Sequence, residues 1–251
     1  MAKLHTLLAA TGAALLVVSA PASTLAVTVE SEPQPLGAGT ARTYVELDDS
    51  GQPVEVGVII TESALADLPA DRAEVVLSLP EAATATGLTH IGLNWQPHGH
   101  PPDAIYHLPH LDIHAYTITP DQRAAITLDE ATLTAAYVTP DATLVPAGYV
   151  LAPNSAEPHQ GTHWIDPTSA EFQGAPHGFD HTLIYGFYNG EMSFIEPMVT
   201  MDFLNSRQSV EVAIAVPQRY SRSGVYPTGY RITYNDDADE HVIALTGFTQ
   251  P

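Results

Sequence analysis

Cysteine is absent from this 251-residue chain. Without thiols the protein can form neither disulfide bonds nor thiolate metal sites, so any bound metal must be held by nitrogen and oxygen ligands. Lysine is nearly absent as well, since Lys3 is the only one. Eight Lys and Arg residues stand against 29 Asp and Glu residues, giving a formal net charge of −21. Such a charge repels nucleic acid and anionic membrane surfaces, so we expect neither as a partner.

Long apolar runs are lacking except near the N-terminus. There Lys3 precedes an apolar stretch from Leu7 to Val18, and small residues follow at Ala20-Pro21-Ala22 and Thr24-Leu25-Ala26. This pattern is typical of a secretory signal peptide, and its apolar run is too short for a comfortable membrane span. We therefore predict a signal peptide over residues 1–26 and an exported mature protein.

The mature chain is expected to hold one large domain. Residues 27–40, rich in Glu, Pro and Gly, are predicted to form a flexible arm, and residues 41–251 a single β-rich domain. The acidic, lysine-free composition is compatible with adaptation to high salt, where screening weakens self-repulsion. It is equally compatible with an ordinary acidic secreted protein.

Short segments rich in β-branched and aromatic residues recur along the chain, separated by Pro, Gly, Asn or Asp. Asn189-Gly190 is the clearest hairpin signal among the turns. These features predict a mainly β fold, a sandwich or barrel, with a few short helices. The predicted strands are Thr43–Leu47, Val54–Ile60, Ala73–Leu79, Thr89–Trp95, His110–Thr119, Ala142–Leu151, Leu183–Tyr188, Ser193–Ile195, Val199–Leu204, Val210–Val216, Tyr230–Tyr234 and His241–Leu245, and the predicted helices lie near Thr61–Ala64, Pro120–Arg123 and Leu128–Ala136.

Histidine is concentrated in one stretch. Five of the twelve histidines fall between residues 98 and 114: His98, His100, His107, His110 and His114. Imidazole is the commonest protein metal ligand, and a nearby carboxylate either binds the metal or orients a histidine. Metal binding is the leading explanation for such density in an apolar, lysine-poor chain.

Polar and apolar residues alternate from His110 to Tyr116, so on a strand His110, Asp112, His114 and Tyr116 share one face. In a straight strand the Cα atoms of His110 and His114 are about 13 Å apart, so both reach one ion only if the side chains lean inward or a bulge shortens the path. A polar stripe of this kind also fits a solvated sheet face.

Ligands from elsewhere in the chain complete the candidate site. His98-Gly99-His100 lies in a predicted loop, His163 follows a glycine turn, and Glu196 sits between apolar residues, where a buried carboxylate needs a partner. His90, His159 and His241 are interpreted as ordinary surface or edge residues. The predicted metal ligands are His110, His114, His163, His100 and Glu196, and the predicted outer partners are Asp112, His98 and Tyr116.

The ordered motifs resemble a small family of exported, uncharacterised microbial proteins, typified by a hypothetical protein from a thermophile. The motifs are Asn94-Trp95-Gln96-Pro97-His98-Gly99-His100-Pro101-Pro102, Pro109 to Tyr116, Gly161-Thr162-His163-Trp164 and Ile195-Glu196-Pro197-Met198. The resemblance implies a β-rich domain over about residues 40–250 that assembles into a ring or another oligomer, and it implies no established reaction. Ala115 departs from the aromatic residue expected at its position.

Three hypotheses for function remain open. The first is a secreted domain that binds a divalent transition metal (Zn, Cu, Fe, Ni or Mn). The second is a secreted metalloenzyme with a cupin-like set of three histidines and one glutamate, an analogy of ligand type and not of fold. The third is a polar histidine cluster without metal in a homo-oligomeric structural protein. Serine hydrolase, zincin and nucleotide-binding motifs are missing from the sequence.

Overall fold

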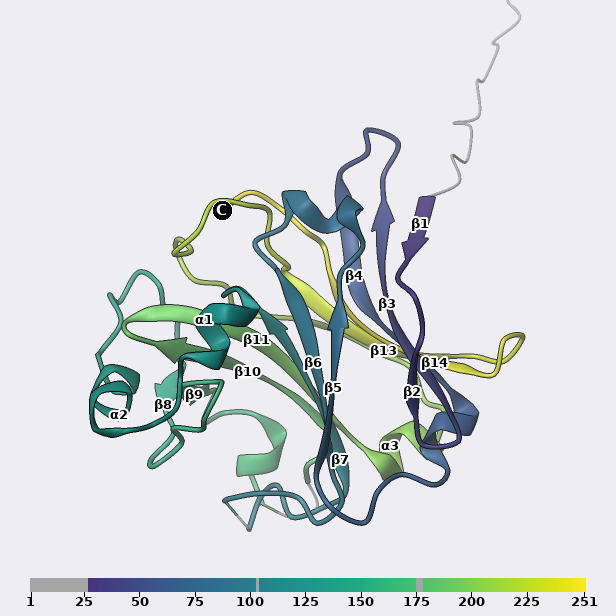
Figure 1. Ribbon diagram of the computed structural model, residues 1–251, viewed down its shortest axis with the longest axis horizontal. Helices are drawn as coiled ribbons and strands as arrows, with labels where there is room; N and C mark the ends of the chain where they lie inside the picture. The colour runs from purple at the N-terminus through teal and green to yellow at the C-terminus, as the bar shows by residue number, and fades with distance from the viewer. Residues whose placement is uncertain (1–26, 103, 175–177) are drawn as a thin grey trace, which may run out of the picture.

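Two antiparallel sheets make up most of the computed structural model, which describes residues 27–102, 104–174 and 178–251 (Figure 1). Each sheet has seven strands, and the order of strands in neither sheet closes into a barrel. The prediction of a mainly β fold with a few short helices is confirmed, and the sandwich-like arrangement is the one observed. The predicted signal peptide, residues 1–26, lies outside the described residues.

The first sheet contains the first and the last strand of the described chain. Its order is β1 (Val27–Glu30), β3 (Gly39–Leu47), β4 (Pro53–Thr61), β14 (Glu240–Thr246), β13 (Gly229–Asn235) and β12 (Val210–Ala213), and β2 (Gln34–Leu36) also pairs with β3.

The second sheet carries the histidine-rich strand near its centre. Its order is β5 (Ala73–Ser78), β6 (His90–Gln96), β7 (His110–Tyr116), β11 (Glu191–Thr200), β10 (His181–Tyr188), β9 (Thr162–Ile165) and β8 (Val150–Leu151). The β10–β11 hairpin turns at Asn189-Gly190, where both residues adopt positive φ, 51° and 75°. The hairpin prediction is therefore confirmed, since this backbone is the one that Asn-Gly favours.

The main apolar core lies between the sheets. Val45 and Val58 from the first sheet and Leu111, Ile113 and Ile195 from the second belong to one buried cluster. Since neighbouring side chains on a strand face opposite ways, this leaves His110, Asp112, His114 and Glu196 on the other face of the second sheet.

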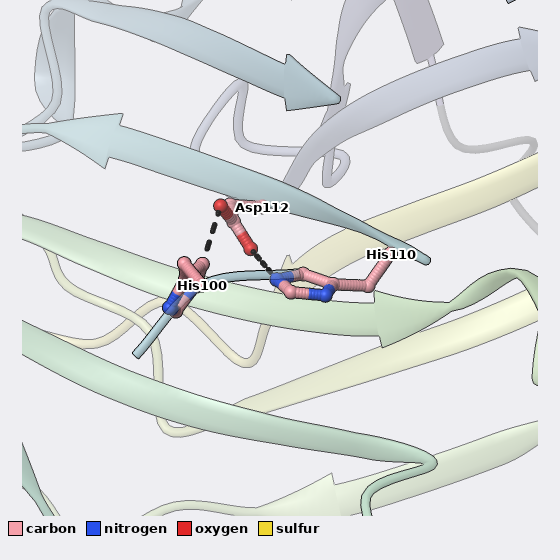
Figure 2. A group of neighbouring side chains, drawn as sticks. All are labelled: His100, His110 and Asp112. Atoms are coloured by element: carbon pink, nitrogen blue, oxygen red, sulfur yellow. Dashed lines mark ion pairs between the residues drawn. The ribbon is translucent and has the colours of Figure 1, made fainter. Parts of the chain in front are cut away.

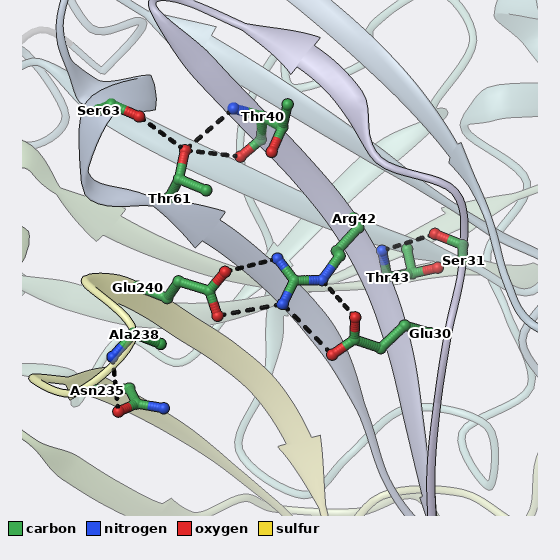
Figure 3. A network of polar contacts seen from close by, with 10 residues as sticks. All are labelled: Glu30, Ser31, Thr40, Arg42, Thr43, Thr61, Ser63, Asn235, Ala238 and Glu240. Carbon is green, nitrogen blue, oxygen red and sulfur yellow. Dashed lines mark hydrogen bonds and ion pairs between the residues drawn. The ribbon is translucent and has the colours of Figure 1, made fainter.

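Segment 27–40 differs from the predicted flexible arm, because β1 and β2 both pair with β3. Arg42 of β3 fixes this edge: its guanidinium contacts Glu30 of β1 at 2.6 Å and Glu240 of β14 at 2.7 Å (Figure 3). The sequence predicts an arm because Glu, Pro and Gly are common in loops. In the structure, Glu30 of this segment pairs with Arg42 of the adjacent strand.

Short helices occur where capping residues favour them. α1 (Pro120–Ala124) begins with a capping box made by Thr119 and Gln122, and Asp129 caps α2 (Glu130–Ala136). These two and the 3-10 turn η1 (Glu62–Leu65) match the predicted helices. Two further 3-10 turns, η2 (Glu81–Ala85) and η3 (Ala170–Phe172), were not predicted.

Two predicted strands are wrong in part. Val199–Leu204 was predicted as a strand, but β11 ends at Thr200 and α3 (Met201–Asn205) follows, because the Thr200 hydroxyl accepts a hydrogen bond from Phe203 N at 3.2 Å. Of Ala142–Leu151 only Val150–Leu151 is a strand. No helix in the described part of the chain is long and apolar enough to cross a membrane.

Candidate metal centre

Strand β7 presents three potential metal ligands on one face, as its alternating sequence predicts. Leu111 and Ile113 point into the core, and His110, Asp112 and His114 point away from it. Although they lie on the outer face of the sheet, all three are at least 98% buried. The stripe is therefore not a solvated sheet face.

Three side chains form a first group, which we call the Asp112 group: His100, His110 and Asp112. His110 Nε2 lies 3.0 Å from Asp112 Oδ1, and His100 Nε2 lies 3.8 Å from Asp112 Oδ2 (Figure 2). Gln96 of β6 donates a hydrogen bond to Asp112 Oδ2 at 2.9 Å. The carboxylate is thus held between the two imidazole rings.

A second group, the Glu196 group, brings together three strands: His114 from β7, His163 from β9 and Glu196 from β11. His114 Nε2 lies 3.2 Å from Glu196 Oε1, and His163 Nε2 lies 3.9 Å from Glu196 Oε2. His163 lies opposite Gly186 of β10, which in turn lies opposite Phe194 of β11. Because Gly186 has no side chain, it leaves room between β9 and β11.

The tautomers of the four histidines are fixed by their Nδ1 atoms. The acceptors are Pro101 O for His100, Leu108 O for His110, Asn94 Oδ1 for His114 and Ser155 O for His163, at 2.7–3.0 Å. Since oxygen atoms of carbonyl groups only accept, each Nδ1 carries the proton, and each Nε2 of the neutral ring carries a lone pair. This outer support is characteristic of metal-binding histidines.

The Nε2 lone pairs point at carboxylate oxygens, which also only accept hydrogen bonds when ionised. Four of these buried atoms have no hydrogen-bond partner among the residues that the structure describes: His110 Nε2, Asp112 Oδ1, His114 Nε2 and Glu196 Oε2. One shared proton can satisfy two acceptor atoms, but each group contains at least three acceptor atoms. A divalent cation satisfies three or more at once, so the donor sets fit a metal ion.

The distances between ligand atoms within each group are close to those found around a bound metal ion. Two ligand atoms that each lie about 2.1 Å from one ion are about 3.0–3.4 Å apart at tetrahedral or octahedral angles, and about 4.2 Å apart when opposite. The closest contact of each group, 3.0 and 3.2 Å, falls in the first range. The longer separations, 3.8 and 3.9 Å, fall between the two.

Burial dominates the acid–base behaviour of the Glu196 group. It lowers the pKa of His114 to about 3 and that of His163 to about 4, so both rings are neutral at pH 7. Burial and the negative charge of Asp112 raise the pKa of Glu196 well above its usual range. Burial and Asp112 therefore favour the neutral form of Glu196, whereas a bound cation would favour its ionised form.

In the Asp112 group, charge outweighs burial. Burial alone would raise the pKa of Asp112, but the adjacent imidazoles of His110 and His100, which can take up a proton, hold it below its usual value. Burial likewise opposes protonation of His100, yet Asp112 raises the pKa of this ring. Asp112 is thus the more readily ionised of the two carboxylates.

The sequence predicts one set of metal ligands, whereas the structure places the predicted ligands in two groups. His110 and His114 belong to different groups, in keeping with the about 13 Å that separates such residues on a straight strand. Asp112, expected as an outer partner, stands among the potential ligands. Tyr116 stacks on His114 with ring centroids 5.7 Å apart, so it packs beside the site. His98 is exposed and belongs to neither group.

Sequence reasoning missed the supporting residues Asn94, Gln96 and Ser155. The alternation of Asn94-Trp95-Gln96 was the available signal, since it places both amides on one face of β6, where Asn94 pairs with Asp112 and Gln96 with His110.

The interpretation of His90 and His241 as surface or edge residues is wrong, because they are 3% and 1% exposed. His241 Nε2 contacts Glu62 at 2.6 Å.

A pocket of about 670 Å³ lies at η2 and the connections that join it to β5 and β6, lined by residues between Leu79 and Thr89 and by Thr117, Arg222 and Ser223. None of the six residues of the two groups lines it. The pocket and the metal-ligand groups are therefore separate features.

Comparison with protein families gives one match. Residues 48–95 match the family model described as TTHB210-like, hypothetical protein TTHB210. The expected resemblance to uncharacterised proteins typified by a thermophile protein is thus confirmed over these residues. The matched part reaches from the turn before β4 to Trp95 in β6, so β7, β9 and β11 lie outside it. No curated protein and no solved structure matches the chain.

Proposed function

We propose that this chain is an exported protein that binds divalent transition-metal ions through two sets of two histidines and one carboxylate. The observation that carries the proposal is the convergence of Nε2 lone pairs on buried carboxylate oxygens, with every Nδ1 already engaged. Nitrogen and oxygen ligands of this kind suit Zn, Cu, Fe, Ni or Mn. Export is supported by the pattern of residues 1–26.

A catalytic role is the second candidate, and the number of ligands favours it. Each group offers three protein ligands, which leaves at least one coordination position for water or substrate, as in catalytic zinc sites. A cupin-like set of His110, His114, His163 and Glu196 around one ion is not supported, because these residues fall in two groups. None of the six candidate ligands lines the separate pocket, so we propose metal binding as the primary role.

The proposal is tested by adding Zn²⁺, Cu²⁺, Ni²⁺, Mn²⁺ or Fe²⁺ to metal-free protein and measuring the melting temperature. An ion that binds only the folded chain stabilises it by RT ln(1 + [L]/Kd), about 2.7 kcal/mol at a concentration 100 times Kd. We expect His110→Ala and His163→Ala each to reduce this gain. His98→Ala is the matched control, because His98 is an exposed histidine outside both groups.

Wild-type protein that gains no stability from any of these ions would contradict the proposal. The cluster would then be a hydrogen-bonded polar face, in which shared protons join the carboxylates to the imidazoles. Glu196→Gln separates the remaining roles: loss of metal from the Glu196 group makes Glu196 a ligand, and retained metal with loss of turnover supports an enzyme in which it acts as a base.

A further inference from the structure

We propose that the Asp112 and Glu196 groups are the two halves of one dinuclear centre, whose ions share a small bridging anion. This inference rests on the proposed function, since it requires that the groups bind metal. It adds that the ions lie close enough to interact and that the ligand of the pair is an anion.

The strand register places the two groups side by side. Asp112 lies between His110 and His114 on one face of β7, and same-face neighbours on a strand are about 6.6 Å apart. On β11, Ile195 pairs with Ala115 and Met198 with Asp112, so Glu196 lies opposite His114. Asp112 and His114, the nearest ligands of the two groups on β7, are thus one same-face step of about 6.6 Å apart, and we expect the two ions at about this separation.

Aromatic side chains pack against one histidine of each group and hold its ring in place. Phe179 meets the His110 ring edge-on at 5.1 Å, and Phe194 meets the His114 ring edge-on at 4.7 Å. The carboxylate oxygens Asp112 Oδ1 and Glu196 Oε2 are buried and have no hydrogen-bond partner within the described ranges of the chain. Such atoms, nearly completely buried and aimed at neighbouring imidazoles, are an independent indication that a cation completes each group.

A centre that holds both ions carries a net positive charge, which favours binding of an anion. Two divalent ions contribute +4, and the ionised carboxylates of Asp112 and Glu196 contribute −2, so a net charge of +2 remains among neutral imidazoles. An anion bound to the open positions of both ions neutralises part of this charge. Phosphate is an anion of suitable size, because two of its oxygen atoms can each bind a different ion.

Solvent contacts one histidine of each group. The side chains of His100 and His163 are 21% and 15% exposed, whereas those of the other four residues are at most 2% exposed. One of these two histidines belongs to each group, so each group has one ligand within reach of solvent. A small anion entering there meets both halves of the centre.

The test uses Cu²⁺ and electron paramagnetic resonance on the full mature chain, because two Cu²⁺ ions at this distance produce a half-field signal that isolated ions do not. We expect two ions per wild-type chain and a half-field signal. His100→Ala and His163→Ala, at the two least buried ligands, should each retain one ion and lose the half-field signal. His98→Ala should behave as wild type.

The outcomes separate this inference from the proposed function. Two ions with only isolated-ion spectra, or a single ion shared by all six residues, would overturn the dinuclear centre while metal binding stands. Binding of no ion would overturn both.

Inorganic phosphate is the probe for the bridging anion. One phosphate should bind per pair of Zn²⁺ ions, and its affinity should fall at least tenfold in both His100→Ala and His163→Ala. Undiminished phosphate binding in either single-ion variant would show that the anion does not bridge.

Discussion

Each histidine of the centre has one nitrogen committed to an oxygen acceptor and the other left for a ligand. The neighbours that impose this arrangement are mainly backbone carbonyls, of Pro101, Leu108 and Ser155. Backbone carbonyls have no sequence signature, so only the side-chain acceptor Asn94 could have been suspected beforehand. This is why the histidines were predictable and their tautomers were not.

His90 gives a prediction about pH that is independent of the metal ligands. Burial, assisted by the positive charge of Arg123, lowers its pKa to about 4 from an ordinary value of 6.5. A histidine whose pKa is lower in the folded state binds its proton preferentially when unfolded. Its neutral form therefore supports folding above pH 6.5, and stability is lost as the pH falls from about 6.5 to about 4.

We expect His90→Gln to make the free energy of unfolding less dependent on pH across that interval. Urea unfolding at pH 7, 6, 5 and 4, with wild type and variant both metal-free, provides the comparison. Exposed His159→Gln is the matched control. Equal slopes for His90→Gln and wild type would show that this ring does not resist protonation.

At the scale of elements, the site depends on one glycine. A Cβ atom added to Gly186 would come within 2.0 Å of Phe194 Cε1, so Phe194 must shift. Phe194 packs on both His114 and His163, at centroid distances of 4.7 and 5.2 Å. A change at β10 is therefore transmitted to ligands on β7 and β9.

We predict that Gly186→Ala destabilises the fold by about 1–3 kcal/mol, the usual cost of overpacking, and weakens metal binding by the Glu196 group. Chemical denaturation and metal titration measure the two effects. Gly178→Ala is the control, because an added Cβ there has no neighbour within 4 Å. Wild-type metal affinity in Gly186→Ala would mean that Phe194 does not position the ligands.

Local signals predicted most strands but not their assembly. The alternation from His110 to Tyr116 and the Asn189-Gly190 turn correctly located β7 and the β10–β11 hairpin. The same reasoning could not foresee that β9, β11 and β7 bring His163, Glu196 and His114 together, because those pairings join residues far apart in the chain. The division of one predicted site into two groups follows from that register.

At the scale of the whole molecule, negative charge dominates. All seven arginines have a hydrogen-bond or ion-pair partner, but seven arginines cannot balance the charge of the 29 acidic residues in the sequence. Exposed carboxylates repel one another across a surface of this kind, and dissolved salt screens that repulsion within about 10 Å at 0.1 M and about 3 Å at 1 M.

We therefore expect the melting temperature to rise by several degrees between about 0.05 M and about 1 M NaCl. Differential scanning calorimetry at constant pH measures this, and the metal-free protein is used so that metal affinity does not contribute. A flat or falling melting temperature would show that self-repulsion does not limit stability.

Elemental analysis of the untagged protein, purified without chelators, tests the central claim most directly. The account predicts a stoichiometric content of a divalent transition metal, approaching two ions per chain, which falls in His114→Ala and in Glu196→Gln but not in His98→Ala. Protein that carries no stoichiometric metal as purified, and takes up none when Zn, Cu, Ni, Mn or Fe is supplied, would contradict it.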